Sequence, residues 1–363
     1  MIPVVILSTV DPVLREAALL SLLTDLPGTG VLRQDLDPET GTLRRVVSDA
    51  DGIHEDVTRL LDHACLGCAI REDSVPALAS MVAARRWERI VWALPVSAQT
   101  LPAARPLCAD GAVDGGRLAS VVTVVDADRL AGDLMGDDLL ADRSVALADD
   151  DRRSVGEAVA AQLGHADLVL TTGSDPVGLT LADHLRGRRT QRTALFHTRA
   201  AQVFAPRHSP RHAEARIDPC RIQAPDAPDA HGVWSLDLLS PRPVHPGRFL
   251  AGLDELAGGR VRSRGRFHLP TRPGRVGVWD AAGRQLSIGD GGPWRVGTPS
   301  TRLVFTGVDE DRARVAGGFA RMLMTDAELA ARHPADDGLD DWPADGDHRP
   351  CGSAALRVST TWS

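Results

Sequence analysis

Short apolar runs alternate with segments of helical periodicity in the first half of the chain, and this alternation constrains the fold more than any other feature. The runs are PVVILS at 3–8, RIVWAL at 89–94, SVVTVVDA at 120–127 and ADLVLTT at 166–172. Between them, apolar residues recur at helical spacing within 11–26, 74–86 and 152–164. Strands that alternate with helices form crossover units, so the sequence predicts an α/β domain with a mostly parallel sheet and helices on both of its faces.

Length and composition exclude several classes of protein. The 363 residues, 43% of them hydrophobic, are enough for one large globular domain or two ordinary ones. No apolar run approaches the roughly 18 residues of a membrane span, and the N-terminus lacks signal-peptide features, so we expect a cytoplasmic protein with no membrane partner. The net charge of −8 predicts no general affinity for nucleic acid. Five cysteines, an odd number, argue against a disulfide framework and leave thiols available to metals.

The sequence contains no lysine and no asparagine, so every fixed cationic side chain is an arginine. Chemistry that needs a lysine amine or an asparagine amide is therefore excluded, which limits the nucleotide-binding motifs that the chain can complete.

The second half of the chain is organised differently. Residues 205–231 are rich in Pro, Arg, His and Asp, and we interpret them as a linker that follows a first domain of residues 1–204. Strand-like runs with Gly turns and segregated helices then predict a smaller α+β domain over 232–333. Within it, the basic run RVRSRGRFH at 260–268 is typical of an exposed strand edge. The acidic, proline-rich residues 334–363 are expected to be disordered.

This order of segments resembles the CobW family of P-loop GTPases, whose members are linked to metal insertion and zinc allocation. The resemblance covers the chain to about Ala331. It rests on PVVILS, CLGCAIRED, SVVTVVDA and, above all, the C-terminal stretches HGVWSLDLLSPRPVHPGRFLAGLDEL, SRGRFHLPTRPGRVGVWDAAGRQLSIGDGGPW and TRLVFTGVDEDR. It implies a P-loop NTPase-like sheet, GTP and Mg²⁺ as ligands of the first domain, and a CobW C-terminal domain.

The family's phosphate-binding loop, LSGFLGAGKTTLL, aligns with LSTVDPVLREAALL at 7–20, where the parts that hold phosphate have changed. Such a loop needs glycines that let backbone N–H groups surround the phosphates, a Lys for the β and γ oxygens, and a hydroxyl for Mg²⁺. Arg15 replaces the Lys and Glu16 replaces the hydroxyl. The glycines are replaced by Thr9, Pro12 and Leu14. Since proline has no N–H to donate and Leu14 resists glycine-type backbone, we expect tight GTP and Mg²⁺ binding to be lost.

Two further nucleotide motifs are also changed. Ala93 stands where the family has an acidic residue after the strand, and the guanine-reading NKxD aligns with TGSD, in which only Asp175 matches. Asp175 can accept a hydrogen bond from a guanine edge, but a lone Asp after a strand is more typical of a helix N-cap. The nucleotide positions that the resemblance still assigns are Ser8, Arg15, Glu16 and Asp175.

The stretch HACLGCAIRED, residues 63–73, places Cys65 and Cys68 three apart, a spacing shared by half-sites for zinc and by dithiol redox pairs. The family's metal motif, C-x-C-C in GCICCTLRED, matches both cysteines, with Gly67 in place of the middle one. The resemblance therefore implies zinc or another soft metal, with His63 as a plausible third ligand. A redox pair at a helix N-terminus and a purely structural role are the alternatives.

Histidines in the linker form a second group of potential ligands. His208 and His212 lie near His197, His231 and Cys220, and side chains of this kind suit Zn, Cu or Ni. Histidines in a mobile Arg/Pro-rich segment are usually solvated, however, so we favour solvated histidines over a metal site there.

These features predict a CobW-like protein of zinc homeostasis that has lost GTPase activity and binds a metal or a partner protein. The partner would be a client metalloprotein or an active family member. The first alternative is an active GTPase metallochaperone that uses Arg15 as its phosphate cation. The second is a structural partner of an active family member, with no metal of its own.

Overall fold

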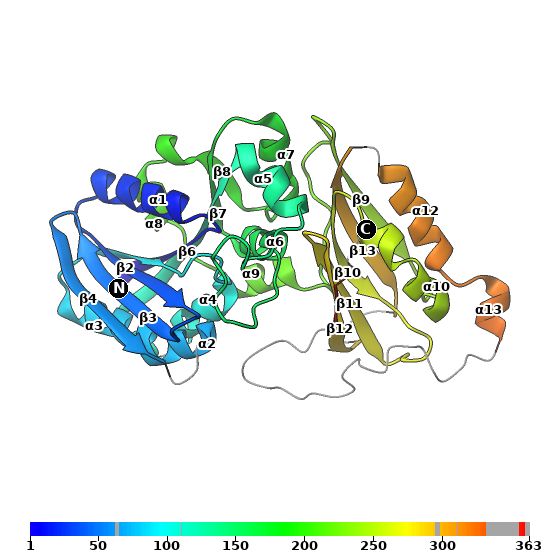
Figure 1. Cartoon of the computed structure of the whole chain (residues 1–363), viewed down its shortest axis with the longest axis horizontal. Helices are drawn as coiled ribbons and strands as arrows, with labels where there is room; N and C mark the ends of the chain where they lie inside the picture. The colour runs from blue at the N-terminus through cyan, green and yellow to red at the C-terminus, as the bar shows by residue number, and fades with distance from the viewer. Residues whose placement is uncertain (62–64, 110, 295–297, 310, 332–355, 360–363) are drawn as a thin grey trace.

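The apolar run at the N-terminus forms an interior strand of an eight-stranded sheet (Figure 1). The computed structural model describes residues 1–61, 65–109, 111–294, 298–309, 311–331 and 356–359. The strands of this sheet are β1 (Ile2–Ser8), β2 (Thr29–Asp37), β3 (Thr42–Asp49), β4 (Gly52–Leu60), β5 (Arg89–Ala93), β6 (Gly116–Asp126), β7 (Leu168–Thr172) and β8 (Gln191–Ala194). Their order is β4-β3-β2-β5-β1-β6-β7-β8, with β2 to β3 and β3 to β4 antiparallel and all other neighbours parallel. The predicted mostly parallel sheet is confirmed.

Helices cover both faces of this sheet, as the continuous apolar strands require. They are α1 (Pro12–Asp25), α2 (Leu66–Ala69), α3 (Val75–Ala84), α4 (Thr100–Cys108), α5 (Ala127–Met135), α6 (Val155–His165), α7 (Pro176–Leu185), α8 (Ala200–Phe204) and α9 (Pro210–Ile217), with a π-helical turn η1 (Ile70–Ser74) and a 3-10 turn η2 (Leu195–His197). On one face, α1 and α8 pack over alternate residues of β1, β5 and β6. On the other, α3 and α4 pack over the residues between them. Among the described residues, no helix has the length and apolar character to cross a membrane.

The C-terminal domain is a separate antiparallel sheet with helices on one face, which confirms the predicted α+β architecture. Its strands are β9 (Val233–Ser240), β10 (Val261–Phe267), β11 (Arg275–Ala282), β12 (Gln285–Pro293), β13 (Thr301–Val308) and β14 (Leu356–Ser359), in the order β14-β12-β11-β10-β13-β9. Its helices are α10 (Pro246–Ala251), α11 (Leu253–Ala257), α12 (Arg312–Met322) and α13 (Asp326–Ala330). Aromatic side chains, among them Phe249, Phe267 and Trp279, fill the core between sheet and helices.

Three predictions for the second half of the chain need correction. The expected linker contains helix α9, whose Ala213 is fully buried. The basic run at 260–268 is not an edge, because β10 pairs with β11 on one side and β13 on the other. In the tail, Leu356–Ser359 pair with β12, contrary to the expected disorder, while residues 334–355 and 360–363 lie outside the described chain.

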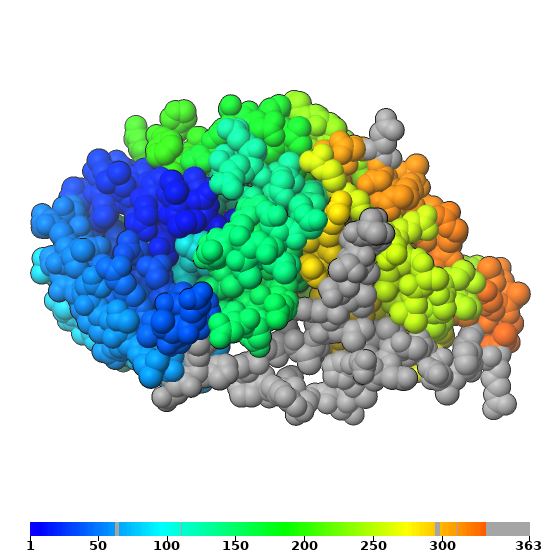
Figure 2. All heavy atoms as spheres, viewed as in Figure 1, coloured from blue at the N-terminus to red at the C-terminus, as the bar shows by residue number. Residues whose placement is uncertain are grey.

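The two domains pack directly against each other through the helix-free face of the second sheet. The green atoms of the first domain lie against the yellow atoms of the second in the space-filling view (Figure 2). Val233, Ala282 and Val308 of the second sheet share a core cluster with α5, α6 and α7. Ser154 donates from its hydroxyl to the Ala282 carbonyl at 3.2 Å, and the Gly283 N–H donates to the Leu134 carbonyl at 3.0 Å.

Glycines make the closest approach of this interface possible. A Cβ atom on Gly156, in the first turn of α6, would lie 2.5 Å from the Leu134 carbonyl oxygen and 2.6 Å from the Gly283 nitrogen. Both contacts are to backbone, so the strain cannot be relieved by turning a side chain. We expect Gly156→Ala to lower the free energy of unfolding by about 1–3 kcal/mol.

The matched control is Gly132→Ala on α5, where a Cβ would meet nothing within 4 Å. This change should leave the protein as stable or slightly more stable, because alanine favours the helix. Urea unfolding of both variants measures the difference, and equal midpoints would show that the interface tolerates a shift.

Candidate functional site

The first turn of α1, where the resemblance places the phosphate loop, is capped by the protein's own carboxylate. Asp11 is the N-cap residue, and its Oδ1 accepts from the Val13 N–H at 2.7 Å and the Leu14 N–H at 3.3 Å. Pro12 has no N–H, and the Arg15 N–H donates to the Asp11 carbonyl at 3.1 Å. The backbone donors that a phosphate needs at this helix N-terminus are therefore absent or already bonded.

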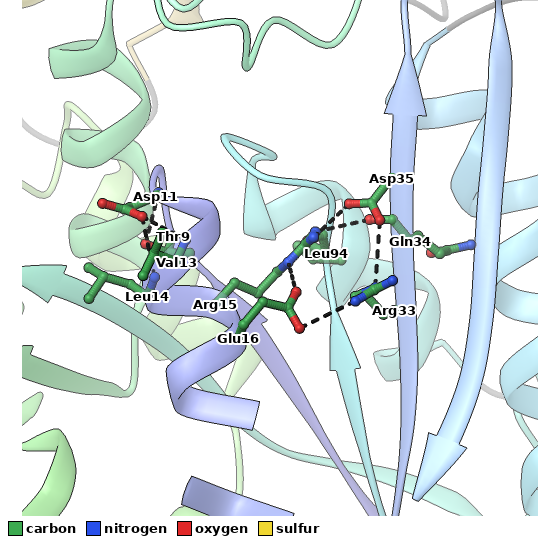
Figure 3. Close-up of polar contacts among 10 residues, drawn as sticks. All are labelled: Thr9, Asp11, Val13, Leu14, Arg15, Glu16, Arg33, Gln34, Asp35 and Leu94. Atoms are coloured by element: carbon green, nitrogen blue, oxygen red, sulfur yellow. Dashed lines mark hydrogen bonds and ion pairs between the residues drawn. The ribbon is translucent and has the colours of Figure 1, made fainter. Parts of the chain in front are cut away.

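Arg15, in the position of the phosphate-binding Lys, points away from this turn into the protein (Figure 3). It is 5% exposed. One terminal nitrogen donates to the carbonyls of Gln34 at 3.2 Å and Leu94 at 3.3 Å, and the other forms an ion pair with Asp35 at 2.7 Å. The Nε atom lies 3.3 Å from Glu16. All three guanidinium nitrogens are thus engaged by α1, β2 and the residue after β5.

Glu16, in the position of the Mg²⁺-binding hydroxyl, takes part in the same network. Its second oxygen lies 3.3 Å from a terminal nitrogen of Arg33, and the Arg33 Nε lies 3.6 Å from Asp35 (Figure 3). Two arginines and two acids therefore alternate across α1 and β2. This arrangement neutralises the carboxylates with side chains of the chain itself.

The other nucleotide positions also serve the fold. Ser8 is buried, and its hydroxyl donates to the Val122 carbonyl at 3.2 Å. Asp175 caps α7 by accepting from the Gly178 N–H at 3.0 Å, which confirms the N-cap interpretation. The Asp128 carboxylate accepts from the Ser174 and Asp175 N–H groups at 2.7 and 2.8 Å. These two bonds lower the pKa of Asp128 and hold the loop that replaces NKxD.

Cys65 and Cys68 lie together at the start of α2. Cys65 is the N-cap residue, and its Sγ accepts from the Cys68 N–H at 3.4 Å. Cys68 is buried, and its Sγ accepts from the Arg71 guanidinium at 3.5 Å. The pKa of Arg71 is raised, first by its hydrogen bond to Glu72 and then by Cys68. A helix N-terminus and a cation beside the sulfurs both favour thiolates, the form that binds metals.

The third ligand is not settled by the described residues. His63 lies outside them, and within them no group of three or more His, Cys, Asp and Glu side chains is arranged to hold a metal. The two linker histidines differ: His212 is exposed as expected, whereas the side chain of His208 is buried and pairs with Asp167 at 2.7 Å. The expectation of a solvated histidine is therefore wrong for His208, which serves the packing of the segment after α8.

A buried network joins the cysteine segment to Arg15. Gln34 on β2 is 1% exposed, and its backbone carbonyl is the one that accepts from Arg15. Its side-chain nitrogen donates to Asp73 at 2.7 Å, and its side-chain oxygen accepts from Ser74 at 2.7 Å and Trp92 at 2.9 Å.

Asp73 and Ser74 belong to η1, which follows α2 directly. Asp73 is also buried, and Arg45 of β3 supplies its counter-ion. One strand residue, Gln34, thus carries hydrogen bonds to both candidate sites. Sequence reasoning missed it, although Gln34 alternates with Leu32 and Leu36, the period of one face of a strand, and this was the available signal.

Two family models match the chain. Residues 40–197 match "CobW/HypB/UreG, nucleotide-binding domain", and residues 233–323 match "Cobalamin synthesis protein cobW C-terminal domain". The chain belongs to the CobW family. The first match begins after the stretch aligned with the phosphate loop and includes Cys65 and Cys68, and the second spans β9 to α12 of this CobW protein.

Curated relatives match over part of their length. "Zinc chaperone Rv0106" of Mycobacterium tuberculosis (strain H37Rv) is 26% identical over 259 residues, which are 68% of this chain and 63% of that protein. The "Uncharacterized protein Mb0109" of Mycobacterium bovis matches with the same identity and coverage. The alignment thus covers less than two thirds of the relatives' length.

Matches to two solved structures cover most of both chains, but their sequence identities and TM-scores are low. The Zn(II)-bound YjiA GTPase from E. coli is 15% identical with a TM-score of 0.33, and the match covers 89% of this chain and 99% of that one. A Zn(II)-bound triple mutant of YjiA is 13% identical with a TM-score of 0.35 and the same coverage.

The buried contacts of Arg15 predict a role in stability. We expect Arg15→Ala to lower the free energy of unfolding by about 2–3 kcal/mol, because it leaves the carbonyls of Gln34 and Leu94 without their donor and Asp35 without its nearest cation. Arg44→Ala is the control, since Arg44 pairs with Asp56 at the surface and such pairs contribute little. Equal losses in the two variants, measured by chemical denaturation, would contradict the structural role.

Proposed function

We propose that this CobW protein is a pseudo-GTPase of zinc homeostasis, which binds zinc or a partner protein without using GTP. The observation that supports the loss of GTPase activity most directly is the state of α1. Its first turn is capped by Asp11, and the cation that replaces the phosphate-binding Lys is buried in an internal ion pair.

Electrostatics weigh against the alternative of an active GTPase with Arg15 as phosphate cation. A triphosphate at the N-terminus of α1 would have to displace the Asp11 carboxylate and would meet its negative charge. Arg15 would have to leave two carbonyls and Asp35 to reach it, and those groups would lose their donor. Neither cost is offset by a Mg²⁺ ligand, because Glu16 is held by Arg15 and Arg33.

Zinc is proposed as the cargo of Cys65 and Cys68. The two thiols share one helical turn, the adjacent Arg71 favours their charged form, and a cytoplasmic location would keep them reduced. With His63 as third ligand the site would keep one position open, a coordination that permits transfer. One curated relative is named a zinc chaperone, which agrees with this cargo, and a client metalloprotein or an active family member would be the recipient.

The proposal predicts that GTP and Mg²⁺ have no effect on the protein. Calorimetric titration should give no Mg²⁺-dependent binding, and the melting temperature should stay unchanged at millimolar GTP, because a ligand of the native state would raise it. Arg15→Lys should not restore binding, since Asp11 and Pro12 still occupy the helix start. Affinity in the low micromolar range, as enzymes show for such substrates, would identify an active GTPase.

The proposal also predicts one Zn²⁺ per chain at the cysteine segment. Cys65→Ser and Cys68→Ser should each abolish binding, and His63→Ala should weaken it. Affinity should fall as the pH is lowered, because thiols must lose their protons to bind. Cys108→Ser, which removes an exposed thiol on α4, is the control and should bind as the wild type does.

Zinc content after dialysis measures the stoichiometry of each variant. If the double cysteine variant keeps one zinc, the site lies elsewhere. If the wild type binds none, the protein acts as a partner of another family member without a metal of its own.

A further inference from the structure

A cavity of about 250 Å³ lies between the two domains, and neither α1 nor the two cysteines line it. Its walls come from the start of α4, the end of α6 and the chain after α9 on one side, and from β10 and β11 on the other. In Figure 1 these elements meet where α6 and α9 approach the second sheet. The cavity includes Arg262 and Arg264 of the basic run that the sequence suggested was an exposed edge.

The charges in the cavity leave one cation unmatched. Arg262 forms an ion pair with Asp280 at 2.6 Å, and Asp218 forms one with Arg221 at 3.5 Å. Arg264 has no carboxylate within 4 Å among the described residues, and its one hydrogen bond goes to the Arg216 carbonyl at 3.1 Å. Burial, with the adjacent charge of Arg262, lowers the pKa of Arg264 to about 10, so the side chain still carries its charge at neutral pH.

A buried histidine at this cavity also has a ring nitrogen that no described residue bonds. His165, the last residue of α6, is 2% exposed and lines the cavity wall. Its Nδ1 lies 2.8 Å from the Thr100 hydroxyl, whereas its Nε2 has no hydrogen-bond partner among the residues that the structure describes. Burial, followed by the charges of His208 and Arg216, lowers the pKa of His165 to about 4, so the ring is neutral at pH 7. When the Thr100 hydroxyl donates to Nδ1, Nε2 carries the hydrogen and is a donor.

Helix α4 begins at the same place. Gln99, Thr100 and Leu101 line the cavity, and the N-cap residue Gln99 makes no side-chain hydrogen bond to the first turn. The positive end of a nine-residue helix therefore meets the cavity wall beside His165. The Arg264 side chain lies near the C-terminal end of α6. One of its terminal nitrogens is 3.7 Å from the position that a Cβ on Gly164 would take.

We propose that this cavity binds a small oxyanion, either the carboxylate of a small molecule or inorganic phosphate in its monoanionic form. Arg264 supplies the charge and hydrogen bonds, His165 donates from Nε2, and the start of α4 contributes its dipole. Because these groups come from both domains, the bound anion joins them and fixes their relative position. The site is independent of the proposed loss of GTPase activity.

The test is titration of the full-length protein with acetate and, separately, with inorganic phosphate, at constant ionic strength set by sodium chloride. We expect saturable heat in calorimetry and a rise in melting temperature for at least one of the two anions. Acetate alone would identify a carboxylate site, and phosphate alone a phosphate site. If neither anion produces a saturable effect beyond that of chloride, the proposal is wrong.

Two variants locate the effect. Arg264→Gln should weaken binding by about tenfold or more, the usual consequence of losing a hydrogen bond to a charged group. Arg260→Gln, which removes the same charge from an exposed pair with Asp309 just before β10, should bind as the wild type does. If Arg264→Gln does not fold, Arg264→Lys, which keeps the charge and loses the planar fork, should still bind more weakly. Binding of equal strength in the wild type and the folded Arg264 variant would overturn the assignment.

Discussion

The guanidinium of Arg15 is the contact on which the first domain depends. In open α/β sheets the carboxyl ends of the strands form the crevice where ligands bind. Here that edge is occupied from within: Arg15 reaches across it to a carbonyl of β2, a carbonyl after β5 and the Asp35 carboxylate. A buried arginine is tolerated only when its donors are satisfied, and these three groups, together with Glu16 at Nε, engage all three nitrogens. The same edge that a nucleotide would organise is therefore held by a side chain.

Much of the fold could be predicted because its signals are local. β-branched runs, the Asp-Pro start of α1 and the capping role of Asp175 depend on neighbouring residues and were found in place. The partners of polar residues could not be predicted, because they come from distant parts of the chain. Gln34 meets Asp73, and β10 became an interior strand through β13, about forty residues later.

In the candidate sites, too, features set by residue type could be predicted, whereas contacts with distant residues could not. Substitutions at Pro12, Arg15 and Glu16 predicted a changed phosphate loop, since the chemistry of a P-loop is tied to residue type. That Arg15 would turn inward was not predictable, because this depends on a carbonyl of β2 and on the carbonyl of the residue after β5. The interdomain cavity gave only a faint signal, arginines at 262, 264 and 266 with the period of a strand. Its other wall comes from three earlier segments, 99–101, 160–165 and 217–222.

The π-helical turn between α2 and α3 has a consequence for how this helix can vary. A π-turn holds one residue more than an α-turn, and each residue advances an α-helix by about 100°. The π-helical turn, Ile70–Ser74, follows the cysteines and contains Asp73, so it sets the angle between the cysteine end and α3, which packs on the sheet. A residue gained or lost in this turn would rotate the cysteine end by about 100° relative to α3 and take Ala69 and Ile70 out of the core, so packing at both ends fixes the length of the turn.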